Sequence, residues 1–131
     1  MPIPSSIILE KKSSLILKLQ KILPKGSVIH DKYETKAYEC DALTAYRCPP
    51  MCVVLPETTQ QVSDVLKICY LENIPVVPRG SGTSLSGGAL PTADCVVLGV
   101  SKLNKVLEID YDNRFIKVQT GRTNLSVSVA I

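Results

Sequence analysis

Residues 76–91 read VVPRGSGTSLSGGALP and hold more than half of the glycine in a chain that has only seven. Arg79 stands directly before the four glycines of this stretch, which are Gly80, Gly82, Gly87 and Gly88. Glycine allows backbone N–H groups to converge on one point, and such a nest carries partial positive charge that attracts anions. The stretch therefore predicts a loop that binds phosphate groups.

Two common glycine motifs do not fit this loop. The dinucleotide fingerprint GxGxxG requires glycine at Leu85 and should open directly into a helix. The P-loop pattern requires lysine where Gly88 stands, which disfavours an ATPase or a GTPase. The loop still offers Arg79 and several hydroxyl groups as donors to phosphate oxygens, from Ser81, Thr83, Ser84 and Ser86. The alternative interpretation is that the glycines only form turns and Arg79 is a solvated surface charge.

Apolar segments on both sides place the loop inside a sheet. CVVLP at 52–56 and IPVVP at 74–78 read as buried strands, and CVVLGV at 95–100 reads as a third. Between the first two, Thr58 and Gln61 form a capping-box pattern at the start of an amphipathic helix that ends near Asn73. A strand, helix, strand unit of this kind predicts parallel strands.

The remaining elements complete an α+β fold, which we expect to be a small mixed sheet with two or three helices. LILKLQKIL at 15–23 has helical spacing and is stopped by Pro24 and Gly26. The mixed stretch 30–50 reads as loop with a short helical turn. Segments 105–110 and 114–119 read as two strands joined by a tight turn, followed by a helix that begins after Thr123 or Asn124.

Composition and charge exclude several classes of protein. A chain of 131 residues with 45% hydrophobic and 21% charged residues fits one globular domain. The net charge of +3 is scattered, which argues against a nucleic-acid partner. Five cysteines without a CxxC pair predict reduced thiols, no metal site and a cytoplasmic location. The N-terminal apolar run is too short for a signal peptide or a transmembrane segment.

The loop and its flanks resemble one family closely. PVVPRGSGTSLSGGALP at 75–91 is similar to the pyrophosphate-binding loop of FAD-linked oxidases with a flavin domain of the vanillyl-alcohol-oxidase, or PCMH, type. YECDALTAYRCPPMCVVLPETTQQVSDVLKIC at 38–69 and KVQTGRTNLSVSVA at 117–130 resemble glycolate oxidase flavoprotein subunits and D-lactate dehydrogenases. The resemblance runs from Tyr38 to Ile131, so we expect a lead-in segment at 1–37 and a flavin domain at 38–131.

The resemblance implies FAD as cofactor and oxidation of a small 2-hydroxy acid, such as glycolate or D-lactate, by hydride transfer to FAD. It implies that the loop and the end of the strand before it bind the FAD pyrophosphate, through Pro78, Arg79, Gly80, Ser81, Gly82, Thr83, Ser84, Gly87 and Gly88. The segment 119–125, QTGRTNL, is expected to be structural, since Arg122 is one place away from the basic residue frequent in the family.

The resemblance also implies that the chain is the N-terminal part of a longer enzyme, without its reaction centre. No residue is predicted to be catalytic. We expect exposed apolar residues near the C-terminus, including Val127, Val129 and Ile131, and hence association with itself, with a complementing C-terminal part or with electron-transfer subunits. The alternative function is a non-catalytic remnant or a small module that binds an anion, a nucleotide or a partner protein.

Overall fold

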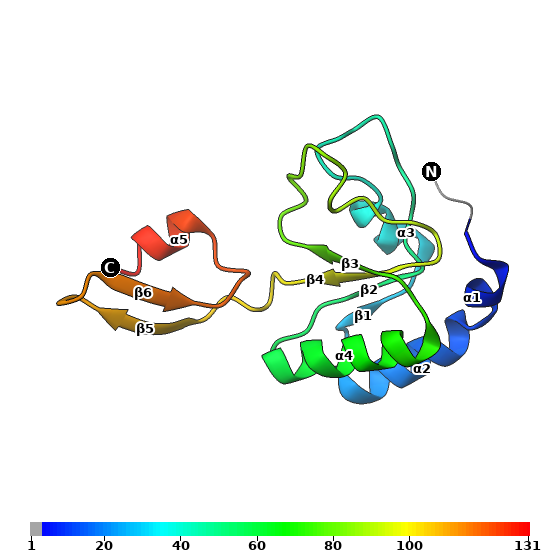
Figure 1. Cartoon of the computed structure of the whole chain (residues 1–131), viewed down its shortest axis with the longest axis horizontal. Helices are drawn as coiled ribbons and strands as arrows, with labels where there is room; N and C mark the ends of the chain where they lie inside the picture. Colours follow the sequence, from blue (N-terminus) through cyan, green and yellow to red (C-terminus); the bar gives the residue numbers. More distant parts are fainter. Residues whose placement is uncertain (1–3) are drawn as a thin grey trace.

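The computed structural model describes residues 4–131 and contains a central mixed sheet (Figure 1). The strands lie in the order β1-β2-β4-β3, and their bounds are Val28–Ile29 for β1, Cys52–Val54 for β2, Val76–Arg79 for β3 and Val96–Gly99 for β4. β4 is parallel to both β2 and β3, whereas β1 is antiparallel to β2. The predicted strands and the α+β class are confirmed. The β2 and β3 strands are not neighbours, because β4 lies between them.

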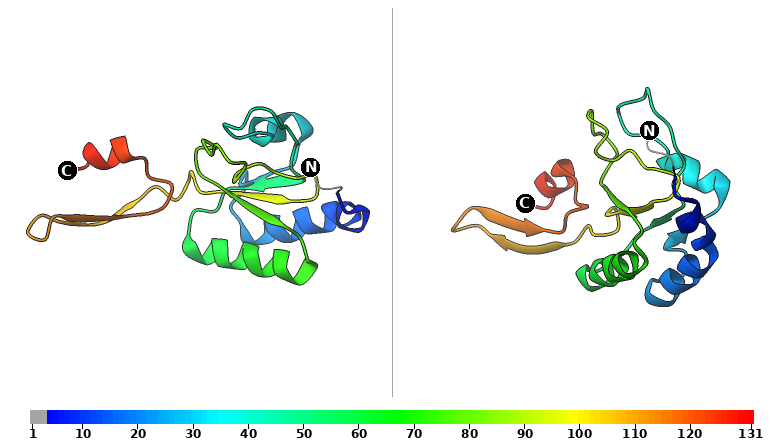
Figure 2. Two further views of the ribbon diagram at one scale, coloured as in Figure 1. Left: turned by 45° about the horizontal axis from the view of Figure 1, so that its top comes forward. Right: turned by 45° about the vertical axis from the view of Figure 1, so that its right-hand side comes forward.

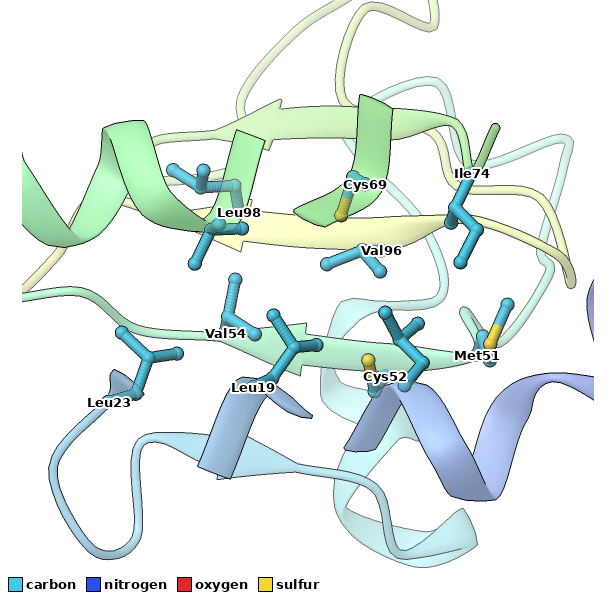
Figure 3. Close-up of a cluster of buried hydrophobic side chains, with 11 residues drawn as sticks. Leu19, Leu23, Met51, Cys52, Val54, Cys69, Ile74, Val96 and Leu98 are labelled. Atoms are coloured by element: carbon cyan, nitrogen blue, oxygen red, sulfur yellow. The ribbon is translucent and has the colours of Figure 1, made fainter. Parts of the chain in front are cut away.

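Two helices cover one face of this sheet, and their apolar residues form the main core. α2 (Lys12–Ile22) lies beside α4 (Thr59–Glu72) below the sheet in Figure 1. Figure 3 shows their buried side chains, among them Leu19 and Cys69, against Val54, Val96 and Leu98 of the strands. The central strands are buried on both faces, which explains their continuous apolar sequences.

The capping pattern read from the sequence is present at α4. The Thr58 hydroxyl accepts a hydrogen bond from the Gln61 N–H at 3.2 Å. The Gln61 side chain reaches back and accepts from the Glu57 N–H at 2.7 Å, one residue before the usual partner. The helix ends at Asn73, whose φ of 55° is the left-handed conformation typical of this position. The structure also has a short helix before α2 that the sequence did not predict, α1 (Ser6–Glu10).

The opposite face of the sheet is covered by the segment after β1 and by the glycine loop (Figure 2). Within the stretch predicted as loop with a short helical turn, the structure has α3 (Lys32–Thr35) and the 3-10 helix η1 (Lys36–Tyr38), followed by loop. Tyr38 packs against a smaller buried cluster, Val53, Cys95 and Val97. The glycine loop and the segment after β1 therefore lie on the same face of the sheet (Figure 2).

The last part of the chain extends away from the sheet as a separate lobe (Figure 1). It contains the antiparallel hairpin β5 (Val106–Asp110) and β6 (Phe115–Val118), and then α5 (Asn124–Ser128). In the described chain, no residue after Leu103 is buried. Val129 and Ile131 are largely exposed, as expected, whereas Val127 is half-buried. Association through this lobe stays a prediction.

Candidate functional site

The glycine loop leaves the sheet at the carboxyl end of β3 with its backbone donors free. Gly82 and Gly87 have φ angles of 72° and 75°, a region that favours glycine. Within residues 4–131, the N–H groups of residues 80–84 donate no hydrogen bond to another part of the protein. Five consecutive N–H groups without a partner in the protein are thus available as donors to a bound anion.

The polar side chains of the loop divide into free and committed groups. Ser81 and Thr83 are exposed, as is Pro78 at the end of β3. The Ser84 hydroxyl accepts from the Gly88 N–H at 3.0 Å and from the Ser86 N–H at 3.4 Å. Ser84 therefore shapes residues 84–90, the far limb of the loop, although its own O–H proton remains available for a ligand.

A cavity of about 340 Å³ lies between the loop and the C-terminal lobe. Gly80 and Ser81 form one wall, and the lining is completed by Val100, Ser101, Thr120, Gly121, Arg122 and Thr123. Of these lining residues in the described chain, only Arg122 is charged. The cavity thus combines hydroxyl groups, glycine backbone and one cation, which suits a negatively charged ligand.

The cavity wall at 120–123 exists because two chain segments cross there. The Gly121 N–H donates to the Leu103 carbonyl at 2.7 Å, and the Gln119 N–H donates to the Lys105 carbonyl at 2.9 Å. A side chain at position 121 would overlap the Val100 carbonyl oxygen. Glycine is therefore required for this approach, which brings the segment after β6 against the segment after β4.

Arg122 fixes this wall further. Its Nη1 donates to the Asn104 carbonyl at 3.1 Å and its Nη2 donates to the Ser126 carbonyl at 3.0 Å. Its Nε is buried and has no hydrogen-bond partner within the described chain. The sequence interpretation treated 119–125 as structural and missed its place beside Gly80 and Ser81. The glycine at 121 was the one signal of a close approach, and sequence alone does not say what approaches it.

Other reactive groups do not gather at the cavity. Burial raises the pKa of the Cys52 thiol to about 12 and that of Cys69 to about 11, so both remain protonated core residues at neutral pH. Burial also raises the pKa values of Cys48 and Cys95. Among residues 4–131, no cluster of three or more His, Cys, Asp or Glu side chains is placed to hold a metal ion. The polar groups that line the cavity are hydroxyl groups, backbone groups and the Arg122 guanidinium.

Comparison with known proteins agrees with this geometry. Residues 50–131 match the family model described as FAD binding domain. The chain is 40% identical over 120 residues to glycolate oxidase subunit GlcD of Escherichia coli, covering 92% of this chain and 24% of the relative. It is 32% identical over 108 residues to D-lactate dehydrogenase of Anaerostipes hadrus, covering 82% and 22%. The chain thus spans about a quarter of the length of these curated relatives.

Solved structures show the same fold at lower sequence identity. p-Cresol methylhydroxylase superposes with a TM-score of 0.84 and 23% identity, covering 98% of this chain and 26% of that protein. The 4-ethylphenol oxidase of Gulosibacter chungangensis gives a TM-score of 0.85 at 22% identity, with 98% and 26% coverage. The predicted PCMH-type flavin-domain fold is confirmed.

The residues present fit FAD, which the family match gives as the cofactor. FAD contains a diphosphate, and the free N–H groups of residues 80–84 supply donors for its oxygens. No acidic side chain of the described chain lines the adjoining cavity, so no lining carboxylate opposes the negative charge.

No helix of the described chain is long and apolar enough to cross a membrane.

Proposed function

Because this chain belongs to the FAD binding domain family, we propose that its glycine loop binds the diphosphate of FAD. The residues proposed to form this site, as contacts or by shaping the loop, are Pro78, Arg79, Gly80, Ser81, Gly82, Thr83, Ser84, Gly87 and Gly88. The observation that carries this proposal is the run of free N–H groups at 80–84 beside a cavity without a carboxylate. The flavin domain is proposed to span residues 38–131, with 1–37 leading into it.

Each part of the loop has a separate task in this proposal. The N–H groups of Gly80, Ser81 and Gly82 donate to phosphate oxygens at the start of the loop. The exposed hydroxyl groups of Ser81 and Thr83 add donors that rotate toward the ligand. Gly87 turns the far limb, and Gly88 ties it to Ser84. The cavity wall at 120–123 excludes water from one side of the ligand.

We further propose that the whole enzyme oxidises a small 2-hydroxy acid, with glycolate and D-lactate as the candidate substrates. The support is the identity to the glycolate oxidase subunit and to D-lactate dehydrogenase. Bound FAD would supply the hydride acceptor for this reaction. As part of this proposal, the groups that bind the substrate and accept its proton lie outside residues 1–131; the chain spans about a quarter of those relatives, which leaves room for them. Electron-transfer subunits and a cytoplasmic location remain predictions.

The test is calorimetric titration of the chain with FAD, ADP and riboflavin. If the loop binds the diphosphate, FAD and ADP bind, and riboflavin, which lacks phosphate, binds at least about tenfold more weakly. Raising the salt concentration should weaken the binding of FAD more than that of riboflavin, because the diphosphate is charged and riboflavin is neutral. Equal affinity for riboflavin and FAD would contradict the proposed site. A chain that binds ADP but whose bound FAD is never reduced by glycolate or D-lactate, even with the remaining enzyme segments added, would be a nucleotide-binding module instead.

A further inference from the structure

Arg79 is half-buried, and its guanidinium contacts other parts of the protein on two sides. Its Nη1 donates to the Cys40 carbonyl at 2.7 Å. Its Cζ lies 5.6 Å from the centre of the Tyr38 ring, close enough for a cation–π contact. On its other side the guanidinium lies against Gly82, where an added Cβ would overlap Nη2 and Cζ. The guanidinium therefore connects the Tyr38–Cys40 segment to residues 80–83, the near limb of the glycine loop.

The far limb of the loop is attached to the same segment by a buried carboxylate. Asp41 is only 4% exposed. Its Oδ1 accepts from the Leu43 N–H at 2.9 Å, and its Oδ2 accepts from the Ala89 N–H at 3.4 Å. The Leu43 side chain also lies 3.7 Å from the place where a Cβ would stand on Gly87. Residues 38–43 thus contact the loop at both of its ends.

From these contacts we propose that residues 38–43 are a clamp that fixes the shape of the glycine loop. Arg79 is a positioning residue of this clamp and not a phosphate ligand. The guanidinium lies over the Tyr38 ring and donates to the Cys40 carbonyl at the same time, which the flexible ammonium of lysine does poorly. A loop whose N–H groups are already oriented binds an anion with less loss of entropy. This consequence for the cofactor rests on the proposed function, whereas the clamp itself does not.

The substitution Arg79→Lys separates the two roles. Lysine keeps the positive charge and binds phosphate well as a point charge, so a direct phosphate contact would largely survive. The clamp contacts would be lost, because lysine cannot make the contact with the Tyr38 ring and the hydrogen bond to the Cys40 carbonyl at the same time. Arg114→Lys is the matched control, because Arg114 is exposed in the hairpin turn, away from the loop.

The experiment uses ¹⁵N relaxation of the full chain and affinity for FAD and ADP. We expect backbone order parameters of about 0.85 for residues 80–90 in the native protein and below about 0.6 for the same residues in Arg79→Lys. The order parameters of β2 and β4 should not change. Asp41→Asn should raise mobility at 86–90 but not at 80–83. Where FAD and ADP bind the native chain, Arg79→Lys should lower the affinity for each about five- to twentyfold.

Each outcome decides between the roles. A rigid loop in Arg79→Lys overturns the clamp, and if affinity is lost at the same time, Arg79 is a direct phosphate ligand. A flexible loop with native affinity overturns the link between the clamp and the cofactor. If the native chain binds neither FAD nor ADP, the proposed function fails, while the order parameters still test the clamp.

Discussion

At the scale of single residues, position 121 is where the structure most clearly requires glycine. It is the point at which the segment leaving β6 passes over the segment leaving β4, with its N–H 2.7 Å from the Leu103 carbonyl. A methyl group at this position would overlap the Val100 carbonyl oxygen, which is backbone and has little freedom to move. The cavity beside Gly80 and Ser81 depends on this approach.

Gly121→Ala should therefore destabilise the chain by about 1–3 kcal/mol, as overpacking of a close contact usually does. Chemical denaturation followed by circular dichroism measures this change. Gly80→Ala is the control, because a Cβ on Gly80 meets nothing within 4 Å. Equal effects of the two substitutions would show that the crossing is not tightly packed.

The site was predictable at those residues whose role is carried by the local backbone. The glycines and hydroxyls of 80–88 form a loop after a strand, and a strand ending and glycine spacing are visible in sequence. Arg122 and Ser101 were not predictable, because their place in the cavity depends on a contact between segments about twenty residues apart. The contacts of Arg79 with Tyr38 and Cys40 span some forty residues and leave no periodic signal in the sequence.

At the scale of elements, α4 connects β2 to β3, the strand that leads into the glycine loop and the proposed cofactor site. Its beginning is stabilised by the Thr58 hydroxyl, which satisfies the Gln61 N–H. Thr58→Ala should lower the free energy of unfolding by about 1 kcal/mol, which thermal melting detects as a lower melting temperature. Thr59 is the first residue inside the helix, so Thr59→Ala should change the melting temperature much less. Equal melting temperatures of the two variants would show that the Thr58 cap is redundant.

α2 and α4 are also joined by Glu72, which accepts from the ammonium groups of Lys18 and Lys11. Hydrogen bonds from Lys18 first, and then from Lys11, hold the pKa of the Glu72 carboxyl below its ordinary value. A carboxyl whose pKa is lowered by folding stabilises the protein above its unfolded pKa of about 4.3, and this contribution is lost as the pH falls through the lower folded pKa.

The melting temperature of Glu72→Gln should therefore lie below that of the native chain near pH 7, and the difference should shrink below about pH 4. The difference is expected to be modest, because the pair is partly solvated. Glu34→Gln is the control, as Glu34 forms no salt bridge within residues 4–131. A difference that stays constant from pH 7 to pH 3 would assign the effect to packing instead of charge.

Apolar patterns made α2, α4 and the strands β2 to β4 predictable, because buried elements leave continuous or periodic apolar patterns, and α4 also has a clear cap at Thr58. α1 was missed, since it has five residues and no side-chain cap. The order β2-β4-β3 was also not predictable, because apolar runs specify burial but not which strands become neighbours.

At the scale of the whole molecule, a well-packed sheet and helix lobe carries a second lobe without a buried core. Leu125, Val129 and Ile131 are each more than two thirds exposed in the C-terminal lobe. A two-stranded hairpin of this kind gains little stability alone. The proposed cofactor site lies beside the cavity where the lobes meet, so its shape depends on the crossing at Gly121 and on the loop together.

The central claim is that the N–H groups of residues 80–84 bind the FAD diphosphate. The most direct measurement is an NMR titration of the ¹⁵N-labelled chain with FAD, with riboflavin in a parallel titration. The account predicts that FAD shifts the amide resonances of residues 80–84 most strongly, with smaller changes at 120–123, and that riboflavin leaves 80–84 largely unchanged. Shifts centred on another surface, or equal shifts at 80–84 with riboflavin, would contradict it.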